Sequence, residues 1–283
     1  MSARIETTNC PYCSSVNSTA WAEEAGFTCV RCNDCRILYC NPRPSAAAVD
    51  SAVRTGAHGA EAGGLVVVSH HEPRKVRFYR DMLVGMFDDV WRRGQPISWI
   101  DVGAGYGEFV EAVSALAPAG SHVSGFEPML PKARSAMARG LNVTNDYLRT
   151  DGPKVDFVST IDVFSHIPDF SAFLGEIRGA LRPGGEVFIE TGNLADVEER
   201  RDFPGELGLP DHLVFAGESH LRGYLERAGF EIVRIRTRRI DDFVNLAKNA
   251  VKLLIGRPGG LGIPYRSKYR QLQIRARLRP AAS

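Results

Sequence analysis

Short apolar runs alternate with helix-like stretches through the central part of the chain. Each run is bounded by glycine, proline or polar residues, which is typical of a strand buried on both faces of a sheet. Apolar residues at helical spacing follow the first run, from Phe109 to Leu116, and recur from Phe170 to Leu181. This alternation predicts an α/β fold around a parallel sheet. The expected strands are residues 97–102, 122–126, 155–164 and 186–190.

Two further segments near the C-terminus alternate like half-buried strands. We expect residues 231–239 and 271–279 to form an antiparallel pair at the edge of the sheet. Between them, a helical stripe of apolar residues extends from Phe243 to Leu254. Such a stripe packs on its own domain or docks on a membrane surface or a partner, and the pattern leaves both interpretations open.

The N-terminal part of the chain has little apolar material for a core of its own. Trp21 and Phe27 flank Gly26 and predict a small hairpin, and residues 37–39 predict a short strand. An alanine-rich helix is expected to begin at Ser45. The three expected parts are residues 1–44 (a small module), 45–95 (a helical linker and lid) and 96–283 (the α/β domain).

All six cysteines lie in the first part, and four of them form two close pairs. Cys10-Pro-Tyr-Cys13 and Cys32-Asn-Asp-Cys35 are separated by eighteen residues. Each C-x-x-C turn can direct two thiolates at one ion, so Cys10, Cys13, Cys32 and Cys35 predict a closed, structural zinc site. Metal binding would supply much of the folding free energy of so small a module. Cys29 is an alternative ligand, and Cys40 is expected to be a buried thiol.

Composition and charge indicate a globular protein with a large core and an uneven distribution of charge. The chain has 283 residues, 44% of them hydrophobic, which is enough for a large core. The formal net charge is +2, but residues 231–283 carry 13 Lys+Arg against 3 Asp+Glu. A basic segment of this kind can meet an anionic surface or simply be solvated. No apolar run is long enough to span a bilayer and none follows the N-terminal charges, so we expect a cytoplasmic protein with reduced thiols.

A glycine-rich turn follows the first expected strand. The glycines of Gly103–Gly107 allow a ligand to approach the backbone closely, and an acid, Glu127, ends the next strand where a ribose diol would bind. Dinucleotide folds prefer G-x-G-x-x-G, but here the last of those positions is Glu108, and Asp101 precedes the turn. A carboxylate there would repel a pyrophosphate and suits a positively charged ligand such as S-adenosylmethionine.

Four motifs occur along the chain in a set order: Asp101–Gly107, Glu127, Asp162–Asp169 and Leu181–Gly185. This order resembles that of class I S-adenosylmethionine-dependent methyltransferases. The paired cysteines before residues 37–44 look like the zinc-binding N-terminus of one subgroup, and residues 212–215 and 221–232 resemble the segment that follows its sheet. The resemblance covers residues 10–233. It implies a Rossmann-like seven-stranded methyltransferase sheet with a small N-terminal zinc ribbon.

The resemblance also implies how the cofactor is held. The glycine turn would wrap its amino-acid end and sugar, Glu127 would bind the ribose hydroxyls, and Asp146 and Tyr147 would lie near adenine. Asp101 would orient the ammonium group through its loop. The implied cofactor-binding residues are Asp101, Gly103, Gly105, Gly107, Glu127, Asp146, Tyr147 and Asp162.

Two histidines are candidates for a catalytic base. His166 follows the fourth strand, and His212 begins the segment that should close over the acceptor. An unperturbed imidazole titrates near ~6.5, so either can accept a proton at neutral pH. The similar subgroup includes enzymes that act on deoxysugars and other glycan-type intermediates, which implies a small, sugar-containing acceptor. Carbon-methylating members usually carry a longer C-terminal domain than residues 234–283, so we favour methylation of oxygen.

Other functions stay open at this point. An RNA methyltransferase would grip RNA with the module and the basic C-terminal region, although the charges within the module balance, and we do not expect nucleic acid as the partner. An NAD-dependent oxidoreductase would place a nicotinamide cofactor at the glycine turn. A non-catalytic protein would have the same fold, and failure to bind S-adenosylmethionine in calorimetry would favour it. Titration with NAD tests the oxidoreductase, and salt-sensitive binding to RNA tests the RNA methyltransferase.

Overall fold

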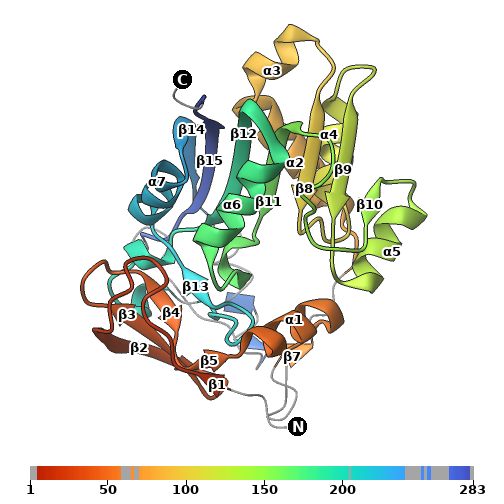
Figure 1. Cartoon of the computed structure of the whole chain (residues 1–283). Helices are drawn as coiled ribbons and strands as arrows, with labels where there is room; N and C mark the ends of the chain where they lie inside the picture. Colours follow the sequence, from red (N-terminus) through yellow and green to blue (C-terminus); the bar gives the residue numbers. More distant parts are fainter. Residues whose placement is uncertain are drawn as a thin grey trace.

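A twisted sheet forms the centre of the computed structural model, which describes residues 5–58, 65–66, 70–203, 205–239, 250–251, 254–255 and 268–280 (Figure 1). The seven strands are ordered β10 (Val143–Thr144), β9 (His122–Phe126), β8 (Ser98–Val102), β11 (Val155–Ile161), β12 (Leu181–Gly192), β15 (Gln271–Leu278) and β14 (Phe230–Arg238). The first five are parallel, and β15 runs antiparallel to both of its neighbours. The expected seven-stranded fold is confirmed.

Helices cover both faces of this sheet because its strands are apolar on both sides. Trp99, Phe157 and Phe188 point to one face, where they pack with α2 (Pro73–Met86), α3 (Asp88–Arg93) and α4 (Glu108–Leu116). Val158 and Ile189, which alternate with them, point to the other face. That face packs with α6 (Phe170–Ala180) and α7 (Glu218–Arg227). Beside β10, α5 (Leu130–Ala138) packs with α4.

The cysteine-rich module contains its own small sheet. The hairpin of β2 (Ser18–Glu24) and β3 (Phe27–Cys32) turns at Gly26, as expected, and β4 (Leu38–Cys40) follows. The fourth strand of this sheet is β13 (Val214–Phe215), which pairs with β4 although it belongs to the α/β domain by sequence. Residues 1–44 are therefore not a closed unit. Strands β1 (Ile5–Glu6) and β5 (Arg43–Pro44) pair beside this sheet.

The segment between the module and the α/β domain is largely helical. It holds α1 (Ala46–Thr55), which begins directly after Ser45 as expected, and the short strand pair β6 (Ala57–His58) and β7 (Leu65–Val66). Figure 1 shows α1 and the module at the same end of the large sheet. This end is where the parallel strands β8, β9 and β11 finish, and it is the end that carries the site described below.

Two strands differ from their expected bounds. β11 ends at Ile161 because Asp162 takes a left-handed conformation, with φ 55°, and residues 164–166 form a 3-10 turn. β12 begins at Leu181 rather than at Glu186. Val155 pairs with Leu181 and Phe157 with Glu186, so residues 182–185 are accommodated as an irregularity within the strand and do not separate it from α6.

Part of the basic excess of the C-terminal region is neutralised inside the fold. Arg275 is only 1% exposed and lies between Glu186 and Asp89, and Arg234 contacts Asp88 at 2.7 Å. Most of the stripe from Phe243 to Leu254 lies outside the described residues, so its packing on the domain and its docking on a membrane or a partner both stay predictions. In the described ranges, no helix combines the length and the apolar character that crossing a bilayer requires.

Candidate active site and metal centre

A cavity of about 880 Å³ opens at the carboxyl ends of β8, β9 and β11. Ligands of open α/β sheets bind at this position, and the volume falls within the range of roughly 300–1,000 Å³ that is usual for small-molecule sites. Every residue that the sequence predicted for cofactor or base lines this cavity, with the exception of Gly107.

The acid after β9 shapes the glycine turn as well as lining the cavity. Glu127 is buried, and its carboxylate accepts hydrogen bonds from the backbone N–H groups of Gly105 at 2.7 Å and Met129 at 2.8 Å. Gly105 has a φ of 57°, and a Cβ added there would meet no atom within 4 Å. The carboxylate of Glu127 therefore fixes the position of the turn, and Gly105 leaves room for a ligand beside the backbone.

Gly107 has a different place. It precedes α4 with a φ of 84°, and an added Cβ would lie 2.5 Å from Cδ1 of Leu141 and 3.0 Å from Cβ of Ala136. These contacts give it a role in close packing of the turn against α5 and its following loop. The sequence pattern could not distinguish such a packing glycine from one that faces a ligand.

Asp101 lies at the end of β8 beneath the turn. Its Oδ1 accepts a hydrogen bond from the hydroxyl of Ser159 at 2.6 Å. Burial and the negative charge of Glu127 raise the pKa of Asp101 to about 8, so the free protein holds this carboxyl mostly protonated at neutral pH. The group that would repel a pyrophosphate is therefore Glu127, and not Asp101 as expected from the sequence. A cation bound at the turn would lower the pKa of Asp101 again.

Helix α1 closes one end of the cavity. The hydroxyl of Tyr147 donates to Oδ1 of Asp50 at 2.6 Å, and the guanidinium of Arg54 lies 4.8 Å from the centre of the Tyr147 ring. Asp146 lines the cavity beside Tyr147. No motif marks α1 in the sequence, and the contact joins residues 97 positions apart, so its part in the site was missed.

Two side chains of α2, Lys75 and Tyr79, also line the cavity and were missed. Burial, together with the nearby carboxyls of Asp162 and Glu190, raises the pKa of Tyr79, which keeps its hydroxyl neutral. Among the described residues of the lining, Lys75 and Lys132 are the lysines and no arginine occurs. The lining also contains nine carboxyl residues: Asp50, Asp101, Glu108, Glu127, Asp146, Asp162, Asp169, Glu176 and Asp211.

The excess of carboxyl residues over lysines determines which sign of charge a ligand of this cavity can carry. Burial raises the pKa of Asp101, Asp162 and Glu176, but the other carboxyl residues of the lining still outnumber its lysines. A cavity of one sign concentrates ligands of the opposite sign. The site therefore suits a ligand with positive charge and disfavours one that carries a pyrophosphate.

His166 and His212 meet in the lining of the cavity, with ring centres 4.8 Å apart. Nδ1 of His166 donates to Oδ1 of Asp211 at 2.9 Å, and Nδ1 of His212 donates to the carbonyl oxygen of Leu207 at 2.6 Å. Because Nδ1 carries the proton in each neutral ring, Nε2 is the nitrogen with a lone pair. Burial and the neighbouring His166 lower the pKa of His212, so it is neutral at pH 7 and able to accept a proton.

The cluster of His166, Asp211 and His212 also has the composition of a metal site, with ligand atoms within 4.8 Å of one another. His166 and Asp211 are already joined by a hydrogen bond between Nδ1 and Oδ1 at 2.9 Å, which orients the imidazole without an ion. The geometry therefore favours a hydrogen-bonded base over a second metal centre.

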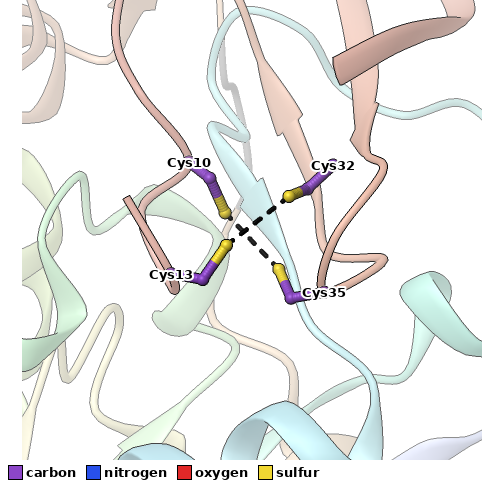
Figure 2. Close-up of side chains that lie close together, drawn as sticks. All are labelled: Cys10, Cys13, Cys32 and Cys35. Carbon is purple, nitrogen blue, oxygen red and sulfur yellow. Dashed lines mark hydrogen bonds between the residues drawn. The ribbon is translucent and has the colours of Figure 1, made fainter. Parts of the chain in front are cut away.

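The two cysteine pairs converge in the module. The sulfurs of Cys10, Cys13, Cys32 and Cys35 lie within 4.8 Å of one another and point toward a common centre (Figure 2). The separations are 3.5 Å for Cys10 and Cys35 and 3.6 Å for Cys13 and Cys32. A tetrahedral zinc site with Zn–S bonds of ~2.3 Å requires sulfurs about 3.8 Å apart, so this donor set fits zinc. Cys29 lies outside the cluster, opposite Cys40, and both thiols are buried.

The two turns that carry these cysteines repeat one backbone pattern. Ser14 N–H donates to the carbonyl of Cys10, and Arg36 N–H donates to that of Cys32, at 2.9 and 3.0 Å. Ser14 and Arg36 have φ values of 64° and 73°, a conformation that favours glycine. Both turns form nonetheless, so the absence of glycine at these positions does not prevent the double-turn arrangement.

The chain matches a known protein family over more than half of its length. The family described as "Methyltransferase domain" matches residues 70–235. The cysteine-rich module precedes the matched residues, and the family therefore says nothing about it.

Curated proteins similar to this chain share one name. The ubiquinone biosynthesis O-methyltransferase of Methylobacterium nodulans is 30% identical over 197 residues, which cover 61% of this chain and 76% of that protein. A protein of the same name from Aromatoleum aromaticum is 25% identical over 169 residues, 48% of this chain and 64% of that protein. The match thus spans less than two thirds of the second relative.

Solved structures include a similar fold. A candidate sarcosine dimethylglycine methyltransferase from Galdieria sulphuraria superimposes with a TM-score of 0.55 at 17% identity, over 74% of this chain and 88% of that one. At this identity the likeness concerns the fold alone.

Proposed function

The chain belongs to the methyltransferase-domain family and is an S-adenosylmethionine-dependent methyltransferase, and from that premise we propose that it methylates a hydroxyl oxygen of a small-molecule acceptor. The observation that carries the proposal is the pair of histidines, His166 and His212, in the same cavity as the glycine turn. A sulfonium donor is already activated, so the protein contributes alignment, worth roughly 7–11 kcal/mol, and a base for the hydroxyl proton.

The cofactor end of the cavity suits a ligand that bears a sulfonium and an ammonium group but no phosphate. Gly103 and Gly105 would receive its amino-acid end, Glu127 its ribose hydroxyls, and Asp146 and Tyr147 its adenine. Asp162 lines the same cavity as the turn and the histidines. The acidic lining and the open side of Gly105 support this assignment.

The acceptor proton moves to a histidine as the new bond forms. In the assigned step, the acceptor oxygen bonds to the methyl carbon, the carbon–sulfur bond breaks, and the thioether leaves uncharged. Nε2 of His212 takes the hydroxyl proton, since its Nδ1 is held by Leu207. His166, held in the same tautomer by Asp211, is the second candidate for this role.

The acceptor is assigned to compounds without phosphate, because the lining of the cavity is acidic. The names of the curated relatives favour a hydroxyl-bearing intermediate of quinone biosynthesis. The sugar-containing acceptor implied by the motifs remains a second candidate, and the relatives give it no support. An RNA acceptor conflicts with the same acidic lining.

We also propose that the four clustered cysteines hold one structural zinc ion. Cys10, Cys13, Cys32 and Cys35 supply four thiolates at separations that fit a closed tetrahedral shell, which leaves no position for a catalytic water. Elemental analysis of the purified protein should find one zinc per chain, and a Cys13→Ser variant should hold far less. Metal-free wild-type protein with normal stability would contradict the assignment.

A transfer assay tests the proposed reaction. Protein, methyl-labelled S-adenosylmethionine and a panel of catechols, hydroquinones and free sugars should yield a labelled ether from at least one hydroxyl compound, in equal amount to the demethylated cofactor. Calorimetry should detect S-adenosylmethionine binding and no binding of NAD. Labelled product on carbon or on RNA, or binding of NAD alone, would contradict the proposal.

A further inference from the structure

One acidic side chain of the cysteine-rich module reaches the loop before His212. Glu24, the last residue of β2, accepts backbone hydrogen bonds from Leu207 at 2.7 Å, Gly208 at 2.6 Å and Leu209 at 3.3 Å. Three N–H groups converging on one carboxylate form a charge-assisted anchor, and such bonds are about twice as strong as neutral ones. The pattern is absent from the sequence motifs, because it joins residues 183 to 185 positions apart.

The same loop holds His212 through its carbonyl groups. Nδ1 of His212 donates to the oxygen of Leu207 at 2.6 Å, and the N–H groups of Asp211 and His212 donate to the oxygen of Gly208 at 2.9 and 3.0 Å. The backbone N–H groups of residues 207–209 therefore point toward the carboxylate of Glu24. The carbonyl oxygens of Leu207 and Gly208 accept hydrogen bonds from the segment that contains His212. A shift of the turn would move the ring and its Nδ1 partner together.

A second connection holds the other side of this segment. Leu213 N–H donates to the oxygen of Ser165, next to His166, at 2.6 Å, and Leu213 oxygen accepts from Cys40 N–H at 2.8 Å. Strand β13 then continues the contact by pairing with β4. The module thus contacts the His212 segment from both ends, with Glu24 before the histidine and β4 after it.

We propose that Glu24 is a positioning residue that the cysteine-rich module contributes to the acceptor site, and that it fixes the place and the tautomer of His212. This inference rests on the proposed role of His212 as the base. Alignment within the acceptor site is what such a residue controls, and a misplacement of about 1 Å can cost about 100-fold in rate. The module is then part of the active site, although none of its cysteines touches the acceptor end.

The test replaces Glu24 by glutamine, whose amide keeps the size of the side chain but presents N–H groups to the N–H groups of the loop. We expect the turnover number of Glu24→Gln to fall between about 10- and 100-fold, with the affinity for S-adenosylmethionine changed by less than about 2-fold. Glu23→Gln is the matched control, because Glu23 is the adjacent and exposed residue of β2, and it should behave as wild type.

Two further readouts distinguish positioning from a general loss of structure. The charged groups that face His212 are His166, Asp211 and Glu24, and Glu24 favours the protonated ring. In Glu24→Gln the acid limb of the pH–rate profile should therefore move to lower pH. NMR spectra of protein with isotope-labelled histidine, with the signal assigned through His212→Ala, should show that the His212 ring no longer populates a single tautomer.

The outcomes separate this inference from the proposed function. Wild-type turnover and an unchanged His212 signal in Glu24→Gln would overturn the positioning role. Normal turnover of His212→Ala would exclude His212 as the base. The His212 signal of Glu24→Gln would then still show whether Glu24 positions the ring. If Glu24→Gln fails to bind cofactor, Glu24→Ala, which removes the carboxylate without adding a donor group, carries the same spectroscopic test. An unchanged signal in that variant would also overturn the role.

Discussion

His212 is half-buried in the part of the cavity that we assign to the acceptor, and its Nδ1 proton is donated to a backbone carbonyl, so a single nitrogen is left to receive a proton. We expect His212→Ala to bind S-adenosylmethionine as the wild type does and to lose turnover by at least about ten-fold. His122→Ala, which removes an exposed imidazole remote from the cavity, is the control. Steady-state rates and calorimetry measure both effects, and unchanged turnover would exclude His212 as the base.

The pH dependence of that rate follows from the same burial. Because burial and His166 lower the pKa of His212, the ring becomes protonated only in acid. The acid limb of the wild-type profile should therefore lie below ~6.5, the value of an unperturbed imidazole.

Asp101 gives a prediction about stability rather than rate. Its pKa is about 8 in the folded protein and ~3.9 in the unfolded chain, so between these values the folded state binds the extra proton. The free energy of unfolding of the wild type should therefore fall as pH rises through this window, by up to about 1.4 kcal/mol per pH unit from this group. Asp101→Asn has no side-chain proton that titrates in this window, so position 101 contributes no pH dependence to its stability.

Thermal or denaturant unfolding of the cofactor-free proteins at several pH values measures this difference. The stability of Asp101→Asn relative to the wild type should grow from pH ~4 to pH ~8 and then stay constant. Glu190, whose pKa is also raised, to about 7, is present in both proteins and cancels from the comparison. Parallel curves for the two proteins would mean that Asp101 is ionised in the fold.

At the scale of elements, α1 closes the part of the cavity that we assign to the cofactor, and Asp50 and Arg54 contact Tyr147 there. Tyr147→Phe removes the hydrogen bond to Asp50 and keeps the ring under Arg54. Loss of one such bond costs about 0.5–1.5 kcal/mol, so we expect the affinity for S-adenosylmethionine to fall by about 2- to 12-fold. Stopped-flow measurement should show this loss as faster release of the cofactor, and an unchanged release rate would show that α1 does not cover the site.

Elements with a strong periodic pattern could be predicted from the sequence. β9 has the predicted bounds, and α6 differs from its prediction by one residue, because apolar spacing and flanking glycine or proline define both. The end of β11 could not be predicted, since the left-handed conformation of Asp162 depends on tertiary contacts, including the bond from Gln271 to its carboxylate at 2.8 Å.

The site was predictable where its residues belong to one motif or one strand end. The glycine turn, Glu127 and the two histidines are of this kind, and all of them except Gly107 line the cavity. Lys75, Tyr79 and Asp50 could not be found, because helices before the first strand of the domain carry them and no local pattern marks the face that they present. Glu24, in strand β2, was missed because its hydrogen bonds to Leu207 and Leu209 join residues 183 to 185 positions apart.

For the molecule as a whole, the module and the α/β domain act as one structure. Arg31 of β3 is buried and donates to the carbonyls of Ala195 and Val197 at 3.0 and 2.5 Å, and the ring of His220 donates to the carbonyl of Cys35 at 2.7 Å. A disturbance of the metal centre should therefore reach the acceptor site through these contacts and through β4.

Cys13→Ser tests this coupling, because Cys13 is exposed and a hydroxyl there has no burial penalty. We expect the variant to lose turnover by at least about 10-fold, while the affinity for S-adenosylmethionine changes by less than about 3-fold, because no residue of 5–44 lines the cavity beside the glycine turn. Treatment of the wild type with a zinc chelator should reproduce the result. Equal loss of turnover and cofactor affinity would instead indicate general unfolding.

The pairing of β4 with β13 has a consequence for biosynthesis. The ribosome completes β4 long before it makes residues 214–215, and until then the outer edge of β4 has backbone groups without their strand partner. A nascent or truncated chain that ends before Val214 should therefore be prone to aggregate by pairing the free edge of β4 with strands of other chains. Chaperone capture during translation would be strongest in that interval and would end once the late strand has docked.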